Sequence, residues 1–189
     1  MSESLSRPPK AVHQFRRVAI LFAGGPAPGA NAVISTAATS FMRNGTEVIG
    51  MKHGYSSLAD YSPAKPLVEG QDYIRITPEF LKRTRSGQGI MLGTARTNPG
   101  KKVSSPAHLE DAERVKQLKN AYEGLVSLGV EALISIGGDD TLKTANKMKL
   151  FQDRLPAGSP RIPVVHLPKT RSEEHTSELQ SRVDISYAV

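Results

Sequence analysis

The chain has 189 residues, with 25 Lys and Arg against 18 Asp and Glu and no cysteine. That length suits one ordinary domain. With 38% hydrophobic and 23% charged residues, the composition is that of a globular protein, which excludes a disordered chain, a collagen and a disulfide scaffold. The apolar run at residues 18–23 is far shorter than the roughly 20 residues that cross a bilayer. No secretory signal is recognisable, so we expect a cytoplasmic protein without a membrane partner.

The formal net charge is +7, and a basic chain can bind nucleic acid, a membrane surface or anionic metabolites. The excess lies in residues 1–170, which hold 23 basic and 14 acidic residues, whereas residues 171–189 hold 2 and 4. Basic residues are scattered, with one compact cluster at Lys82–Arg85, and they do not alternate with aromatics as in a single-strand-binding groove. We therefore expect small phosphorylated ligands and no nucleic acid.

The first predicted elements form a βαβ unit. Residues 1–16 contain few apolar side chains and are expected to be a flexible leader. An all-apolar run at residues 18–22, closed by the turn GGPAPG, predicts a strand buried on both faces. Residues 30–42 have apolar side chains at helical spacing and precede the stop signal Asn44-Gly45. Residues 47–51 then predict a second strand, joined to the first by a right-handed crossover.

The rest of the chain continues the alternation of helix and strand. Residues 52–75 show no clean periodicity and are expected to be mostly loop. The strongest helix signal has Ser105 as its N-cap and Pro106 as its first residue, and it ends at Gly129. The other predicted elements are a short helix at 78–85, strands at 90–92, 131–136 and 162–167, and a helix at 141–151. Together they predict an α/β fold over residues 17–170, a Rossmann-like parallel sheet with flanking helices.

In such a sheet, ligands collect beyond the carboxyl ends of the strands. After the first strand, Gly25 lies in a glycine turn whose backbone can approach an anion, while the next helix points its free N–H groups there. The turn matches neither GxGxxG nor GxxxxGK[ST], and many such turns need glycine for backbone angles only. Arg96 follows the predicted third strand and can donate two hydrogen bonds to a phosphate, the alternative being a solvated loop arginine.

Charged residues also follow the last two predicted strands. Asp139 and Asp140 in GGDDT can simply cap a helix, or Asp139 can hold Mg²⁺, which prefers one or two carboxylates with phosphates and waters. Asp140 would then add negative charge and bulk where a longer polyphosphate would pass. Lys169 can neutralise phosphate charge at the same rim, unless it is an ordinary surface lysine. His166 lies within a predicted strand and is expected to be packed and hydrogen-bonded.

Four motifs, taken together, resemble the phosphofructokinase family: GGPAPGAN at 24–31, GTAR at 93–96, GGDDT at 137–141 and PKT at 168–170. The resemblance implies the N-terminal part of the phosphofructokinase fold, truncated. It implies Mg²⁺-dependent phosphoryl transfer to the 1-hydroxyl of fructose 6-phosphate, a reaction of glycolysis, and a full-length form that is a homo-oligomer. By family pattern Gly25 and Arg96 bind the phosphoryl donor, Asp139 binds the metal and Thr170 contacts the sugar phosphate.

The resemblance also bears on the phosphoryl donor. ATP-using members usually have glycine after the first Asp of GGD and before the final Thr, whereas pyrophosphate-using members have Asp and Lys. Asp140 and Lys169 occupy those positions here, so both are assigned to donor binding and pyrophosphate is the expected donor. The aspartate repels a nucleotide α-phosphate, and the lysine stabilises compact pyrophosphate. The alternatives are an ATP-dependent 6-phosphofructokinase and a non-enzymatic module that binds anions or nucleic acid.

The chain departs from the family pattern after Thr170. The family continues with Ile-Asp-Asn-Asp, whose first Asp is the base, and Ser172 stands at that position. Because a serine without a partner cannot accept this proton near neutral pH, we assign no catalytic residue and expect this chain to be inactive. The run RSEEHTSELQS at 171–181 resembles a translated sequencing-library adapter. Residues 171–189 are therefore expected to be a non-native tail, the alternative being a divergent natural one.

Overall fold

The structure is a computed structural model that describes residues 14–169. Thr170, Ser172 and the expected foreign tail lie outside the described residues, as does most of the expected leader. No helix within the described range has the length and apolar character of a transmembrane span.

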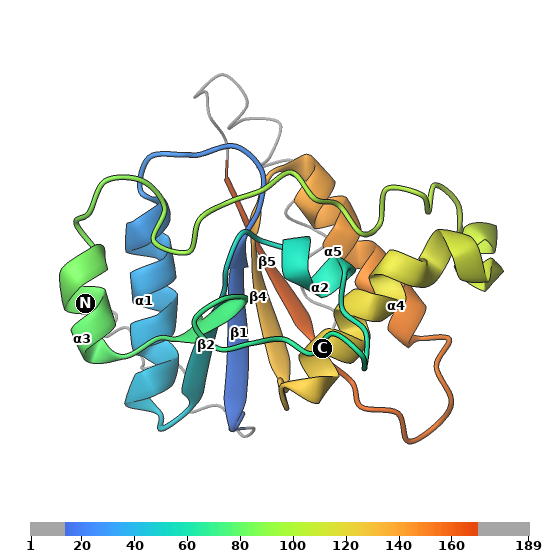
Figure 1. The fold of residues 1–189 in the computed structure, drawn as a ribbon, viewed down its shortest axis with the longest axis horizontal. Coiled ribbons are helices and arrows are strands. Elements are labelled where there is room, and N and C mark those ends of the chain that lie inside the picture. Colours follow the sequence, from blue (N-terminus) through green and yellow to red (C-terminus); the bar gives the residue numbers. More distant parts are fainter. Residues whose placement is uncertain (1–13, 170–189) are drawn as a thin grey trace, which may run out of the picture.

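Five strands form one sheet in the order β3-β2-β1-β4-β5 (Figure 1). Four of them are parallel, and β3 runs antiparallel to β2 at one edge. The α/β fold and the predicted sheet are confirmed, with β3 as the exception to the parallel arrangement. The strands are β1 Arg17–Phe22, β2 Glu47–Met51, β3 Tyr73–Arg75, β4 Ala132–Gly137 and β5 Val164–Pro168.

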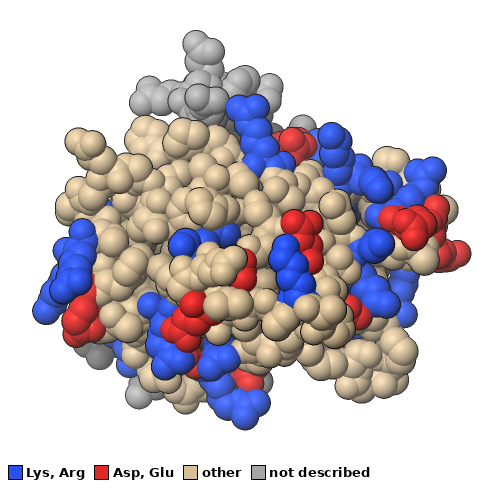
Figure 2. Space-filling model, viewed as in Figure 1, with Lys and Arg blue, Asp and Glu red and all other residues tan. Residues whose placement is uncertain are grey.

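Helices cover the sheet on both faces (Figure 1). The helices α1 Ala30–Arg43 and α3 Pro78–Thr84 pack on one face, and α2 Ser56–Ala59, α4 Ala112–Ser127 and α5 Asp139–Gln152 pack on the other. On the side that Figure 2 shows, Lys and Arg are scattered among Asp and Glu and form no single basic stripe.

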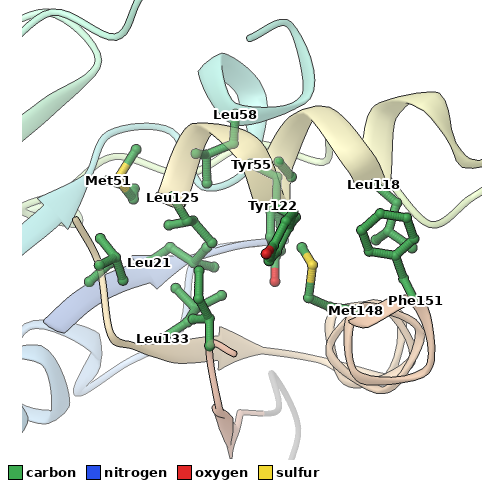
Figure 3. Close-up of a cluster of buried hydrophobic side chains, with 14 of the residues drawn as sticks. Leu21, Met51, Tyr55, Leu58, Leu118, Tyr122, Leu125, Leu133, Met148 and Phe151 are labelled. Carbon is green, nitrogen blue, oxygen red and sulfur yellow. The ribbon is translucent and has the colours of Figure 1, made fainter. Parts of the chain in front are cut away.

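The core lies on both faces of the sheet because the central strands are apolar at every position. In β1, Ile20 and Phe22 face α1, whereas Ala19 and Leu21 face α4. On the α4 side, side chains from the sheet and from three helices point toward one another (Figure 3). Burial of this apolar surface is the main force that holds the strands in place. The carboxyl ends of the four parallel strands are thereby fixed at the same end of the sheet, the upper end in Figure 1.

The prediction of a strand at residues 90–92 is wrong. That segment is a turn, closed by the Gly93 N–H donating to the Ile90 carbonyl at 2.8 Å, and the Asn31 side chain accepts from the Met91 N–H at 2.8 Å. Because these bonds use the backbone groups that a strand needs, the apolar side chains pack without entering the sheet. The third strand is β3, which lies within the segment expected to be loop, as does α2.

The helix predicted from Pro106 begins later than expected. Pro106–Glu110 is a short 3-10 helix, and α4 starts after it. The N-cap is Asp111 in place of Ser105, because the Asp111 carboxylate accepts from the N–H groups of Glu113 and Arg114 at 3.0 and 3.2 Å. The predicted N-cap is therefore six residues too early, because Ser105 and Pro106 begin the 3-10 helix and not α4.

Candidate functional site

The loops at the carboxyl ends of β1, β4 and β5 are fastened to one another by backbone hydrogen bonds. The Ala23 N–H donates to the Ile136 carbonyl at 2.9 Å, and the Lys169 N–H donates to the Gly137 carbonyl at 2.9 Å. The segment that follows the turn at 90–93 joins them, since the Gly24 N–H donates to the Ala95 carbonyl at 2.9 Å. Residues far apart in sequence thus meet at one rim of the sheet.

A pocket of about 220 Å³ opens at this rim. Its lining includes three of the residues predicted to bind the phosphoryl donor, Gly25, Arg96 and Asp140. Among residues 14–169, neither the Arg96 guanidinium nor the Asp140 carboxylate makes an ion pair or a side-chain hydrogen bond. The pocket therefore holds a cation and an anion that are both open to a ligand.

Lys169 lies at the glycine turn. Its ammonium donates to the Gly25 carbonyl and is 5.6 Å from the centroid of the Phe22 ring, within the range of a cation–π interaction. Gly24 has a φ of 90°, and a Cβ built there would lie 3.6 Å from the Lys169 Nζ atom. The turn thus needs glycine for its backbone angle, and the lysine is the residue that lies against it.

Asp139, the predicted metal ligand, does not line the pocket. Its Oδ2 atom lies 2.6 Å from the Nζ atom of Lys143, one turn further along α5, and both side chains are about half exposed. No group of three or more metal-ligating side chains occurs within residues 14–169. A single accessible carboxylate at a helix start is nevertheless a donor set that suits Mg²⁺, which keeps several waters and takes its other ligands from phosphates.

Two helices begin at the same rim with uncapped N-termini. The N-cap positions are Gly29 for α1 and Gly138 for α5, and neither supplies a side-chain hydrogen bond to its helix. The first N–H groups of each helix are therefore not satisfied by a capping side chain. Together with the positive end of each helix dipole, they favour an anion at this end of the sheet.

The pocket also contains polar residues that the sequence did not reveal, notably Tyr55, Asn98 and Thr144. Burial raises the pKa of Tyr55 to about 12, opposed by its contact with the Ser135 hydroxyl, 3.5 Å away. Tyr55 is thus a neutral phenol at the back of the pocket. In the sequence, the one sign that Asn98 belongs to this pocket was its position two residues after Arg96 in the same loop.

His166 is packed as expected but is not hydrogen-bonded. Among the described residues, neither of its ring nitrogens has a hydrogen-bond partner, although both are buried. Burial lowers the pKa of His166, and the nearby Gly137 backbone opposes this shift without reaching hydrogen-bonding geometry. The expectation of a hydrogen-bonded histidine is therefore wrong, and His166 is a neutral ring under α5 near pH 7.

A second hollow, of about 450 Å³, lies between α1 and α3. Arg43, Lys82 and Arg85 line it, and no carboxylate does. It includes part of the basic cluster noted in the sequence, but it lies away from the strand ends where the predicted site residues meet. It gives the chain a second place at which an anion can be attracted.

Comparison with known proteins decides the family. The family model described as phosphofructokinase matches residues 17–177. This chain belongs to the phosphofructokinase family. It is 35% identical over 156 residues to a pyrophosphate–fructose 6-phosphate 1-phosphotransferase of Thermotoga maritima, covering 82% of the chain and 31% of the relative. It is also 38% identical over 154 residues to an ATP-dependent 6-phosphofructokinase of Aquifex aeolicus, covering 82% of the chain and 39% of the relative.

Solved phosphofructokinases share the fold. A pyrophosphate-dependent phosphofructokinase from Marinobacter aquaeolei matches with a TM-score of 0.59 and 16% identity, over 82% of this chain and 34% of that one. The phosphofructokinase of Pichia pastoris matches with a TM-score of 0.62 and 22% identity, over 89% and 17%. The chain spans about a third of the length of the curated relatives it matches.

Proposed function

We propose that this chain carries the phosphoryl-donor site of a pyrophosphate-dependent 6-phosphofructokinase. That enzyme transfers a phosphoryl group from pyrophosphate to the 1-hydroxyl of fructose 6-phosphate, giving fructose 1,6-bisphosphate. The observation that carries the proposal is the convergence of Gly25, Arg96 and Asp140 on one pocket, with Lys169 against the same glycine turn. Relatives named for either donor are equally similar to the chain, so the choice of donor rests on this geometry.

Pyrophosphate fits the charges of the pocket better than ATP does. Arg96 offers a planar fork that binds two phosphate oxygens at once, and the uncapped starts of α1 and α5 add N–H groups. The Asp140 carboxylate lines the same pocket and would oppose the additional phosphate of a nucleotide by like-charge repulsion. A compact dianionic or trianionic ligand can use the cations and remain clear of this carboxylate.

Asp139 is the residue that would hold Mg²⁺. When bound, the ion neutralises phosphate charge and so favours departure of the leaving phosphate. The residues of the chain have separate tasks: Arg96 orients the phosphates, and the Lys169 ammonium adds positive charge beside the glycine turn. The Asp139 Oδ2 atom lies 2.6 Å from the Lys143 Nζ atom, so a bound metal ion would compete with this lysine for the carboxylate.

We also propose that no residue of this chain takes the proton of the sugar hydroxyl. Ser172 occupies the position at which the family has its base, and Thr170 is the one residue assigned to the sugar phosphate. We therefore propose that this chain binds the phosphoryl donor and does not transfer it. Assays with pyrophosphate, Mg²⁺ and fructose 6-phosphate are expected to yield no bisphosphate, and measurable turnover would refute the inactivity.

The origin of residues 171–189 is a separate question. We propose that it derives from a sequencing adapter, on the strength of RSEEHTSELQS at 171–181. Long-read sequencing of the genomic locus tests this directly. The expected result is a different reading frame after codon 170, and an authentic coding sequence for 171–189 at that locus would overturn the proposal.

Calorimetric titration tests the donor site. With excess Mg²⁺, the chain is expected to bind pyrophosphate more tightly than ATP, and Arg96→Gln is expected to weaken pyrophosphate binding at least about tenfold. Arg83→Gln removes the same charge from an exposed position of α3 that lines neither hollow, and should leave the affinity unchanged. Tighter binding of ATP would favour the ATP-dependent enzyme. Salt-sensitive RNA binding without any pyrophosphate binding would favour a nucleic-acid module.

A further inference from the structure

The pocket holds one polar side chain whose orientation is fixed by the fold and whose remaining hydrogen-bonding group is unused. We propose that Asn98 is a further binding residue for the phosphoryl donor, and that its Nδ2 amino group donates to a phosphate oxygen beside Arg96. The inference rests on the proposed function, because it assigns a residue to the same donor site. It adds a neutral hydrogen-bond donor to the charged residues already described.

The direction of the Asn98 amide follows from one backbone bond. The Gly100 N–H lies 2.9 Å from Oδ1 of Asn98, and since a backbone N–H can only donate, the atom it meets must be the carbonyl oxygen. The Thr144 hydroxyl lies 2.7 Å from the same oxygen and 2.9 Å from the Asp140 carbonyl, so its one proton is shared between these two acceptors. Both contacts use Oδ1, so Nδ2 has no hydrogen-bond partner within the part of the chain that the structure describes.

The loop that carries Asn98 is held on both sides. Lys147 of α5 donates to the Gly100 carbonyl at 3.0 Å, and the hydroxyls of Ser56 and Thr97 lie 3.0 Å apart. A Cβ built on Gly100 would come within 2.9 Å of the Lys147 side chain, which shows how closely α5 packs on this loop. Asn98 is thus placed before a ligand arrives, and little conformational entropy is lost when its amide binds.

A neutral donor suits this pocket because Asp140 lines it too. A lysine at position 98 would be drawn to the Asp140 carboxylate, and that pair would cancel the charge that selects a compact donor. An amide adds a hydrogen bond to an anionic oxygen, which is stronger than a bond between neutral groups. It leaves Arg96 to provide positive charge and Asp140 to reject longer phosphates.

Asn98→Asp is the decisive variant because it keeps the size of the side chain and replaces the unused amino group with an oxygen. It also adds a negative charge, so each titration is repeated at about 1 M salt, where repulsion between accessible charges is screened. Its carboxylate still accepts from Gly100 and Thr144, so the loop is kept, while an oxygen replaces Nδ2. Calorimetric titration of the whole chain with pyrophosphate in excess Mg²⁺ is expected to show binding at least about tenfold weaker than for the parent chain. The matched control is Ser56→Ala. It removes the hydroxyl that contacts Thr97 and helps to hold the loop, but Ser56 does not line the pocket, so the affinity should not change. Melting temperatures verify that each variant is folded.

Each outcome either supports or overturns the role proposed for Asn98. Weaker binding by Asn98→Asp that persists at high salt, with unchanged binding by Ser56→Ala, supports the inference. A loss that high salt removes is due to charge repulsion alone and overturns it. Equal loss in both variants means that the loop alone matters and overturns it. Parent-like binding by Asn98→Asp overturns it as well, while the donor site itself stands. If the parent chain fails to bind pyrophosphate, the proposed function fails and this inference fails with it.

Discussion

Where the four parallel strands begin, Arg17 of β1 pairs with Glu47 of β2 at 2.7 Å, and Arg75, the last residue of the antiparallel strand β3, approaches the same carboxylate at 3.1 Å. At the carboxyl ends, Arg96 and Asp140 line one pocket, and within the described residues neither side chain has a polar partner. Both ends of the sheet therefore carry charge, but Arg96 and Asp140 in the pocket are not paired with each other as Arg17 and Glu47 are. The paired charges stabilise the fold, whereas the side chains of Arg96 and Asp140 are available to bind a ligand.

Removing core volume between the two ends has the largest expected effect. Leu133 of β4 is fully buried, with helices packed over its face of the sheet. Leu133→Ala is expected to lower the free energy of unfolding by about 3 kcal/mol, through lost apolar burial and the cavity left behind. Urea denaturation measures this. The control is Val68→Ala, at a side chain that is 49% exposed, which should change stability by less than about 0.5 kcal/mol. A similar small change for Leu133→Ala would contradict the packing described.

Breaking a pair at the amino ends is expected to affect stability alone. Arg17→Gln removes a partly exposed ion pair and should lower the free energy of unfolding by at most about 1 kcal/mol. Pyrophosphate affinity should not change, since Arg17 lies at the opposite end of β1 from the pocket. This is the converse of Arg96→Gln, for which we expect weaker binding and unchanged stability. If both variants shifted the same quantity, the distinction between the two ends would fail.

The smallest expected effect is a pH dependence from His166. Its pKa in the folded protein lies below the ordinary value of 6.5 because the ring is buried. The unfolded chain therefore binds a proton that the folded one rejects, so stability falls as the pH drops below that value. In urea denaturation at about pH 7.5 and about pH 5.5, His166→Leu should lose less stability on acidification than the parent chain. An equal loss in both proteins would show that other groups cause it.

The sequence predicted best what depends on local patterns. Strands buried on both faces, such as the one at 18–22, were visible as uninterrupted apolar runs, and the residues after them identified the rim of the site. The edge strand β3 was not visible, because three residues that are only partly buried or exposed give no such run. Residues 90–92 looked like a strand since their burial is caused by distant contacts, among them the bond from Asn31.

Asn98 shows why part of the site escaped prediction. Its orientation depends on Gly100, two residues away, and on Thr144, which lies 46 residues further along the chain. Nothing in a sequence reports that such a pair meets. Asp140 could be placed at the pocket because it follows the strand-end motif of β4, and position in a parallel sheet implies convergence. Arg96 also lines the pocket, although the strand predicted before it is a turn.

The most direct test of the central claim, that the strand-end loops form one anion site, is an amide NMR titration of the chain with pyrophosphate and Mg²⁺. The account predicts saturable shifts confined to the amides of the rim, at Gly24, Gly25, Arg96, Asp140 and Lys169. Shifts centred instead on Arg43, Lys82 and Arg85, in the basic hollow between α1 and α3, would contradict it.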